Sequence, residues 1–159
     1  MPELNSTRKK SILSVPVSEL VPHSDPMVLI DQVIDFEADK LSAQFTIQPN
    51  SRFYDDSIEG VDNVVAIEYM AQSIAALAGV RSRLKQEAVK LGFLLGTRKM
   101  ELHRACFSLG ETYQVEVEEL YMDDSGLGSF HCSISCEGHL VAEAKLSVFE
   151  TNDQNQLLN

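Results

Sequence analysis

The sequence predicts an α+β domain in which one antiparallel sheet wraps around a single long, buried helix. Three observations support this fold class. Residues 62–84 are mostly apolar and rich in helix-forming Ala and Leu. The stretches before and after them alternate apolar and polar residues, as strands with one buried face do. Short connections such as DDSGLG join the later stretches, which is typical of antiparallel neighbours.

The N-terminal part of the chain leads irregularly into the sheet. Residues 1–14 form a polar start that we expect to be a mobile segment. A short helical turn is predicted at residues 17–21. The sequence VPHSDPM follows, and its Pro22 and Pro26 force an irregular path that holds His23 inside a turn.

Six strands are predicted, two before the helix and four after it. In chain order they cover residues 28–36, 41–47, 91–100, 113–121, 129–136 and 140–149. Residues 49–61 and 102–110 are loops by composition. We find no internal repeat and no linker, so residues 15–150 are predicted to form one domain, with a frayed tail at residues 151–159.

The long helix carries a carboxylate among small side chains. At about 100° per residue, one face collects large apolar residues, namely Ile67, Met70, Ile74 and Leu77. The opposite stripe holds Glu68 together with Val64, Ala71, Gln72, Ala75 and Gly79. Such a stripe lets another backbone or a slim ligand approach closely. The alternative is a solvated face, with Glu68 and Gln72 pointing into water.

Composition and charge limit the classes of function. The 159 residues carry a formal net charge of −11, which argues against a nucleic-acid partner. No apolar run that would span a bilayer and no signal peptide are evident, so a cytoplasmic location without membrane insertion is the expectation. Cys106, Cys132 and Cys136 cannot all pair, and with His131 and His139 they match no compact zinc pattern. We therefore interpret the thiols as small hydrophobic side chains and predict no metal.

Positive charge is concentrated after the helix. Seven of the 13 Lys and Arg residues lie between positions 81 and 104, namely Arg81, Arg83, Lys85, Lys90, Arg98, Lys99 and Arg104. Only Glu87 and Glu101 oppose them in that segment. The segment is either a solvated helix end and loop or a docking patch for an acidic partner or a phosphorylated ligand.

Three stretches of this chain resemble a known family. PHSDPMVLIDQVIDF at residues 22–36, IEYMAQSIA at residues 67–75 and LLGTRKMELHRACFSLGE at residues 94–111 are similar to the hot dog fold β-hydroxyacyl-acyl carrier protein dehydratases. Within that family, the resemblance is to the divergent, dehydratase-like branch of the aryl polyene type. It extends over residues 20–149, with the order and spacing of the elements in agreement.

The resemblance implies an acid–base pair at each of two sites in a dimer. A histidine from the loop ahead of the helix takes the α-proton of a 3-hydroxyacyl thioester, and the helix carboxylate protonates the leaving hydroxyl. Glu68 matches that carboxylate, and Gln72 matches the amide one turn later. Backbone N–H groups at the helix start, at Asn63 and Val64, would polarise the thioester carbonyl. The acyl chain would then run beside Ala71 and Ala75.

The loop histidine of the family has no counterpart at the matching positions of this sequence. In the usual enzymes it lies in a His-Phe-Pro-Gly segment, whereas residues 52–63 here read RFYDDSIEGVDN. An ungapped count back from Glu68 reaches Tyr54, whose high ordinary pKa makes it a poor base near neutrality. Three alternatives stay open: His23 reaches the site, Tyr54 serves as a weak acid or hydrogen-bond donor, or a partner subunit supplies the histidine.

We therefore predict a 3-hydroxyacyl-acyl carrier protein dehydratase, or a subunit of one, in fatty-acid or polyene-type biosynthesis. The alternatives are a hot dog acyl thioesterase and a catalytically silent partner of an active dehydratase. The resemblance also implies a homodimer or a heterodimer with a related subunit, and no cofactor beyond the phosphopantetheine of the carrier. The residues expected to dock the acidic carrier are Arg81, Arg83, Lys85, Arg98, Lys99 and Arg104.

Overall fold

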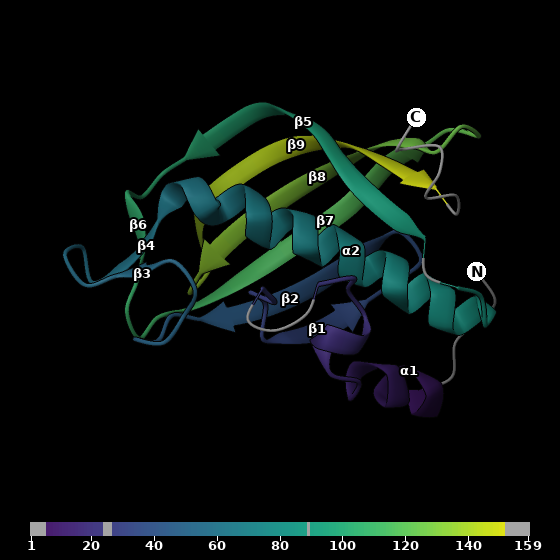
Figure 1. Ribbon diagram of the computed structural model, residues 1–159, viewed down its shortest axis with the longest axis horizontal. Coiled ribbons are helices and arrows are strands. Elements are labelled where there is room, and N and C mark those ends of the chain that lie inside the picture. Colours follow the sequence, from purple (N-terminus) through teal and green to yellow (C-terminus); the bar gives the residue numbers. More distant parts are fainter. Residues whose placement is uncertain (1–5, 24–26, 89, 152–159) are drawn as a thin grey trace.

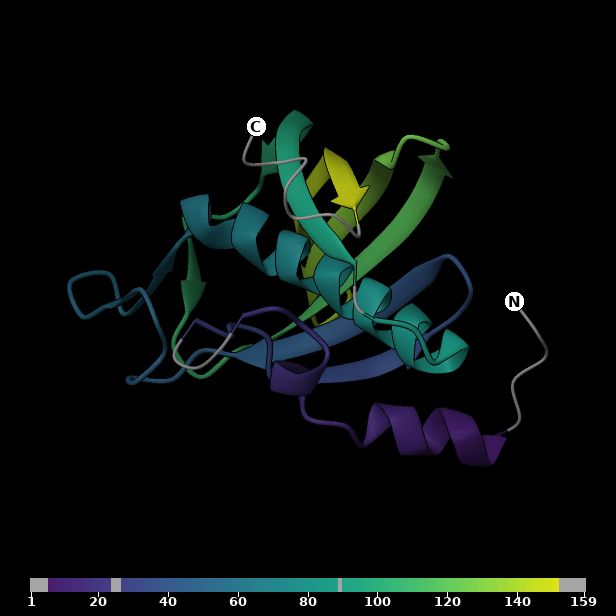
Figure 2. The ribbon, with the colours of Figure 1, turned by 45° about the vertical axis from the view of Figure 1, so that its right-hand side comes forward.

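A curved six-stranded antiparallel sheet wraps around one central helix (Figures 1 and 2). The computed structural model describes residues 6–23, 27–88 and 90–151. Its helices are α1 (Ser6–Leu13) and α2 (Ala66–Lys85), with short 3-10 turns at Val17–Glu19 and Asn63–Val65. The strands are β1 (Gln32–Phe36), β2 (Lys40–Thr46), β3 (Tyr54–Asp55), β4 (Gly60–Asp62), β5 (Leu91–Leu102), β6 (Cys106–Ser108), β7 (Thr112–Met122), β8 (Leu127–Cys136) and β9 (His139–Thr151).

The large sheet has the order β1-β2-β7-β8-β9-β5, with every neighbouring pair antiparallel. Strand β5 follows α2 in the chain but pairs with the last strand, so it forms one edge of the sheet. The predicted α+β hot dog architecture and its six main strands are confirmed. The predicted loops also contain three short strands, β3, β4 and β6, which form a second sheet. Strands this short have no periodicity that sequence patterns can reveal.

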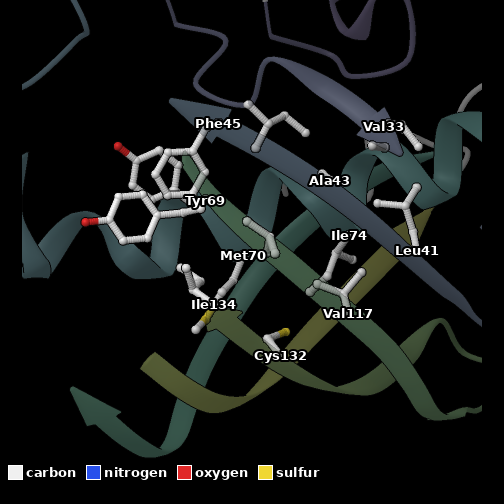
Figure 3. Close-up of a cluster of buried hydrophobic side chains, with 14 of the residues drawn as sticks. Val33, Leu41, Ala43, Phe45, Tyr69, Met70, Ile74, Val117, Cys132 and Ile134 are labelled. Atoms are coloured by element: carbon white, nitrogen blue, oxygen red, sulfur yellow. The ribbon is translucent and has the colours of Figure 1, made fainter. Parts of the chain in front are cut away.

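The core lies between α2 and the concave face of the sheet. Met70, Ile74 and Leu77 are buried as predicted and face the sheet. Figure 3 shows Met70 and Ile74 above Val117 and Ile134, which come from β7 and β8. Burial of this apolar surface is the main source of stability, at roughly 25 cal/mol per Å².

Aromatic rings complete the core near the start of α2. Phe45 of β2 stacks on Tyr69 with ring centroids 3.7 Å apart and an interplanar angle of 4° (Figure 3). Phe107 of β6 meets both rings edge-on. These contacts fix the first turn of α2, and with it the backbone of Glu68, against the sheet.

The stripe of small residues on α2 is partly covered by backbone, as expected. A Cβ at Gly79 would lie 2.0 Å from the carbonyl oxygen of Leu20, so only glycine fits there. Gln72 is fully buried, which makes the alternative of a solvated Gln72 wrong. The segment that follows the turn at residues 17–19 therefore packs along one side of the stripe, and the other side stays open.

The chain before the domain also contains structure. Residues 1–5 and 152–159, where mobility was predicted, lie outside the described residues. Helix α1 was not predicted, because STRKKSIL has little apolar periodicity. It buries Ile12, and Arg8 donates a hydrogen bond to the carbonyl of Leu84 near the end of α2. Thr151, assigned to the tail, still pairs with Leu91 in the sheet.

Residues Asn63–Lys85 are long and apolar enough to cross a bilayer, with a mean hydropathy of 1.3. The stretch is not an uninterrupted apolar run, because Glu68 lies within it. In the fold this stretch contains the central helix, and 56% of its apolar window is buried inside the protein. Its apolar character is explained by the sheet that wraps around it (Figure 1).

Candidate functional site

A pocket of about 210 Å³ opens between α2 and the edge of the sheet formed by β5 and β9. Three alanines of α2, Ala71, Ala75 and Ala78, line its floor at helical spacing. Apolar groups of Phe93 and Val148 come from the two strands. The small side chains that the sequence placed on the stripe beside Glu68 thus leave room for this pocket.

His23 and Glu68 meet at this pocket. The His23 Nε2 and Glu68 Oε1 atoms are 3.5 Å apart, and the two side chains are 30% and 40% exposed. His23 is placed by the turn after Val17–Glu19, and Glu68 by the first turn of α2. Within the described part of the chain, the buried Nδ1 atom of His23 has no hydrogen-bond partner. Nε2 is therefore the ring atom through which His23 contacts Glu68.

Gln72 anchors the segment that follows His23. Its Nε2 donates hydrogen bonds to the carbonyl of Met27 (2.8 Å) and to Glu68 Oε1 (3.2 Å). Its Oε1 accepts from the N–H of Leu29 at 2.8 Å. The N–H of Leu29 thus bonds to a side chain of α2, and β1 starts at Gln32 rather than at residue 28 as predicted. One amide thus positions both the carboxylate and the chain segment beyond His23.

Asn63 and Val64, just before α2, do not line this pocket. The N–H of Val64 donates to Asp62 Oδ1 at 2.9 Å, and the N–H of Asn63 donates to the carbonyl of Ala105 at 3.2 Å. Both amides expected to polarise a thioester carbonyl therefore have intramolecular partners here. The Val64 side chain is 70% exposed. The Asn63 side chain donates to the carbonyl of Arg104 instead.

Tyr54 belongs to the short strand β3 and does not line the pocket of Glu68 within the described residues. Desolvation and the nearby Asp56 carboxylate raise the pKa of its phenol. A raised pKa makes the phenol a weaker acid and leaves still less phenolate to act as a base near neutrality. Of the two candidates on this chain, His23 rather than Tyr54 lies next to Glu68 in the described structure.

The six residues predicted to dock a carrier do not form one patch. Arg81, Arg83 and Lys85 lie at the C-terminal end of α2, and Arg98, Lys99 and Arg104 lie along and beyond the second half of β5. Arg81 is held by Glu119 (3.1 Å) and by the carbonyl of Ala38. Arg104 contacts Glu111 at 3.2 Å and, through its carbonyl, the start of α2. The two groups thus lie at opposite ends of the helix.

The structure adds pocket residues that were not expected at this site, three of which carry a charge or an aromatic ring. Phe93 and Lys90 lie near the start of β5, and Glu150 lies near the end of β9. Burial raises the pKa of the Glu150 carboxyl, although the nearby Arg81 and Lys90 act in the opposite direction. Strand alternation was a usable signal, because residue 150 follows the inward-facing positions 144, 146 and 148.

Two of the three thiols are buried, as expected of small hydrophobic side chains, and Cys106 is half-buried. Cys132 and Cys136 are buried, and burial raises the pKa of Cys132 to about 12. His131 pairs with Glu143 at 3.0 Å across β8 and β9. Among the described residues, no group of three His, Cys, Asp or Glu side chains is arranged to hold a metal ion.

A sheet wrapped around one helix, with a carboxylate and a histidine at a pocket beside that helix, defines a hot dog protein of the acyl-thioester dehydratase class. The chain belongs to the ApeP-like family: the family profile, described as ApeP dehydratase, matches residues 15–159. The fold class and the resemblance predicted from the sequence are thereby confirmed.

Individual relatives agree with this assignment. The chain is similar to the solved dehydratase heterocomplex ApeI:P from Xenorhabdus doucetiae, with a TM-score of 0.84, 31% identity and coverage of 91% of this chain and 98% of that one. It is 26% identical to the 3-hydroxyacyl-[acyl-carrier-protein] dehydratase FabZ of Acetivibrio thermocellus over 89% of this chain and 97% of the relative. The FabZ of Anaeromyxobacter dehalogenans is 30% identical over 71% of this chain and 75% of the relative.

A thioesterase-like neighbour shares only the fold. The hypothetical thioesterase with coenzyme A from Streptococcus pneumoniae aligns with a TM-score of 0.60 at 10% identity, over 76% of this chain and 84% of that one. The family match and the FabZ relatives therefore support dehydration rather than thioester hydrolysis as the activity of this family.

Proposed function

We propose that this chain dehydrates 3-hydroxyacyl thioesters carried by an acyl carrier protein, as the active unit or as one subunit of a dehydratase. The observation that carries this proposal is the His23–Glu68 pair, 3.5 Å apart at the edge of a pocket lined by three alanines and other apolar side chains. An acid and a base within reach of one substrate are what water elimination requires.

In the proposed reaction His23 removes a proton from the α-carbon of the thioester. The electrons form the new α,β double bond, and the β-hydroxyl leaves as water after Glu68 gives it a proton. The proton balance closes when His23 returns its proton to Glu68, and the short separation of the two side chains suits this step. The acyl chain lies in the pocket, beside Ala71 and Ala75.

Replacement of Glu68 tests this function. Glu68→Gln keeps the shape and the hydrogen bond from Gln72 but removes the titrating proton, so we expect turnover to fall by about 10²- to 10⁴-fold. The measurement follows enoyl thioester and free thiol from a 3-hydroxyacyl thioester, with the chain alone and with a related hot dog subunit. Release of free thiol would instead favour the thioesterase alternative.

Glu118→Gln is the matched control, because Glu118 is exposed on β7, away from the pocket. Unchanged turnover in Glu68→Gln would contradict the assignment. The variant His23→Asn tests whether the base comes from this chain or from the partner subunit. If this variant keeps its turnover, while a histidine variant of the partner subunit loses it, the partner supplies the base and this chain contributes only the acid.

A related hot dog subunit is proposed to pair with β5. This strand is one edge of the sheet, forms one wall of the pocket and exposes Phe93, Leu94 and Leu95 by 41%, 41% and 58%. Open apolar edges favour strand pairing with another chain. The similarity to a heterocomplex from Xenorhabdus doucetiae supports a partner of the same fold. A cytoplasmic location stays part of this proposal.

The carrier is proposed to dock at the Glu68 end of the pocket, through Arg98, Lys99 and Arg104. Strand β5 starts beside Ala78, where Gly92 and Phe93 line the pocket, and continues toward the start of α2, where Arg104 contacts Asn63. These three cations therefore lie on the side from which a thioester reaches Glu68. An acidic carrier protein would meet them through complementary charge.

Charge reversal at the two ends of α2 tests this docking surface. We expect Arg98→Glu combined with Lys99→Glu to raise KM for a carrier-bound substrate by about tenfold or more, because like charges then face the carrier. Turnover of a short pantetheine thioester should be unaffected. The control is Arg83→Glu combined with Lys85→Glu at the other end. A larger effect of the control pair would place the carrier at the C-terminal end of α2.

A further inference from the structure

Glu150 interrupts the apolar inner face of β9. Ala144, Leu146 and Val148 alternate inward and are buried, and Glu150 occupies the next inward position. Its strand neighbour on β5 is Gly92, which has no side chain. A half-buried carboxylate therefore stands where the alternation calls for an apolar side chain.

The Glu150 side chain marks the boundary between two cavities. It lines the 210 Å³ pocket that contains Glu68 and also a second cavity of about 290 Å³ beside Arg81 and Lys85. Both cavities share Ala78, Lys90 and Glu150. The first is bounded mainly by small and apolar side chains, whereas the second is bounded mainly by charged ones. The lining thus changes from apolar to charged at Glu150.

Within the part of the chain that the structure describes, no hydrogen bond or ion pair involves the carboxylate of Glu150. Burial disfavours its charged form and raises its pKa, and the Glu119 carboxylate adds to this effect, while Arg81, Lys90 and Lys85 oppose it. Retaining a poorly compensated acid on the inner face of a sheet is unfavourable for folding. A role in the pocket gives a reason for its presence.

The distance between the two acids can be estimated from the helix. Glu68 and Ala78 both line the pocket and are ten residues apart on α2, which corresponds to about 15 Å along the helix axis. Glu150 lies at the Ala78 end, because it shares the second cavity with Ala78. An acyl chain that starts at Glu68 therefore meets Glu150 after about this distance.

We infer that Glu150 sets the length of the apolar acyl chain that this site accepts. Chains that end before Glu150 bury their methylene groups against Ala71, Ala75 and Phe93. A longer apolar chain must remove water from the Glu150 carboxylate without offering it a hydrogen bond, and that is unfavourable. The inference rests on the proposed function, in which the acyl chain fills this pocket.

The test compares 3-hydroxyacyl thioesters of pantetheine with increasing chain length, which makes the result independent of carrier docking. For each length, kcat/KM is measured with the wild type, Glu150→Leu and Glu150→Gln, together with the related subunit if the chain alone is inactive. We expect Glu150→Leu to raise the ratio of long-chain to short-chain kcat/KM by about tenfold or more, since each buried methylene group favours binding. Glu150→Gln removes the charge but stays polar, so its ratio should lie in between.

Glu118→Leu, on the outer face of β7, controls for the added apolar surface and should keep the wild-type ratio. A Glu150→Leu variant that folds and keeps the wild-type chain-length profile overturns the inference. If Glu150→Leu does not fold, an unchanged profile in Glu150→Gln does the same.

Binding separates this inference from the proposed reaction. Thermal shifts of Glu68→Gln with saturated acyl-pantetheine thioesters report which lengths bind, without any turnover. A length cut-off that moves when Glu150→Leu is added supports the role of Glu150 even if no dehydration is observed. A cut-off that stays in place contradicts it even if dehydration is confirmed.

Discussion

At the scale of single residues, Gln72 links the helix to the segment that carries His23. Its amide is fully buried and takes part in three hydrogen bonds, to Met27, Leu29 and Glu68. Two of these bonds pair the carbonyl of Met27 and the N–H of Leu29, which lie ahead of β1 and have no strand partner among the described residues. The residue therefore orders the pocket rim and orients the carboxylate through the same side chain.

We predict that Gln72→Leu destabilises the fold by about 1–3 kcal/mol, because backbone groups of Met27 and Leu29 lose their partners. Urea unfolding followed by circular dichroism measures the change. Gln32→Leu, at an exposed position of β1, is the control and should change the stability little. A loss below about 0.5 kcal/mol for Gln72→Leu would mean that water replaces the amide without difficulty.

Sequence patterns could identify only one member of the His23–Glu68 pair. Glu68 could be found because an acid among small helical residues is conspicuous in the sequence. His23 was one of three candidates, because no periodicity relates a turn at residue 23 to a helix at residue 68. Only the path of the turn, held through Gln72, brings the two side chains to 3.5 Å.

At the scale of elements, close packing of the N-terminal segment against α2 depends on Gly79. A methyl group at this position would lie 2.0 Å from the carbonyl oxygen of Leu20 and 3.0 Å from its Cα atom. Helix propensity favours Ala over Gly by about 1 kcal/mol in a helix interior. Helix propensity therefore favours Ala at position 79, whereas packing against Leu20 favours Gly.

We predict that Gly79→Ala destabilises the protein by about 1–3 kcal/mol, since backbone atoms of the neighbouring segment have to move. Thermal unfolding measures the sign directly. Gly96→Ala is the comparison, because a Cβ there meets nothing within 4 Å. Stabilisation by Gly79→Ala would show that the segment around Leu20 moves aside without loss, and that propensity decides the outcome.

At the scale of the whole molecule, the open edge of β5 is the surface proposed for association. The chain has a net charge of −11, yet β5 presents Arg98 and Lys99 beside the exposed Leu94 and Leu95. Apolar contact at Leu94 and Leu95 favours pairing at this edge, whereas Arg98 and Lys99, further along β5, are the cations proposed to meet the carrier.

We predict that Leu95→Glu weakens association with a related hot dog subunit by tenfold or more, because a charged group on an edge strand opposes strand pairing. Sedimentation velocity and co-purification measure the complex. Leu120→Glu is the control, since Leu120 is exposed on β7, which β8 and β9 separate from β5. An unchanged complex would move the proposed interface away from β5.

The sequence by itself determined the fold class, the central helix, the six main strands and the stripe of small residues that contains Glu68. These features repeat along the chain with the periods of helix and strand, so local patterns contain them. Only the tertiary structure decided that His23 meets Glu68, that the cations divide between two ends of α2, and that Glu150 faces the pocket. These relations join segments far apart in the sequence, and they depend on how the sheet curves around the helix.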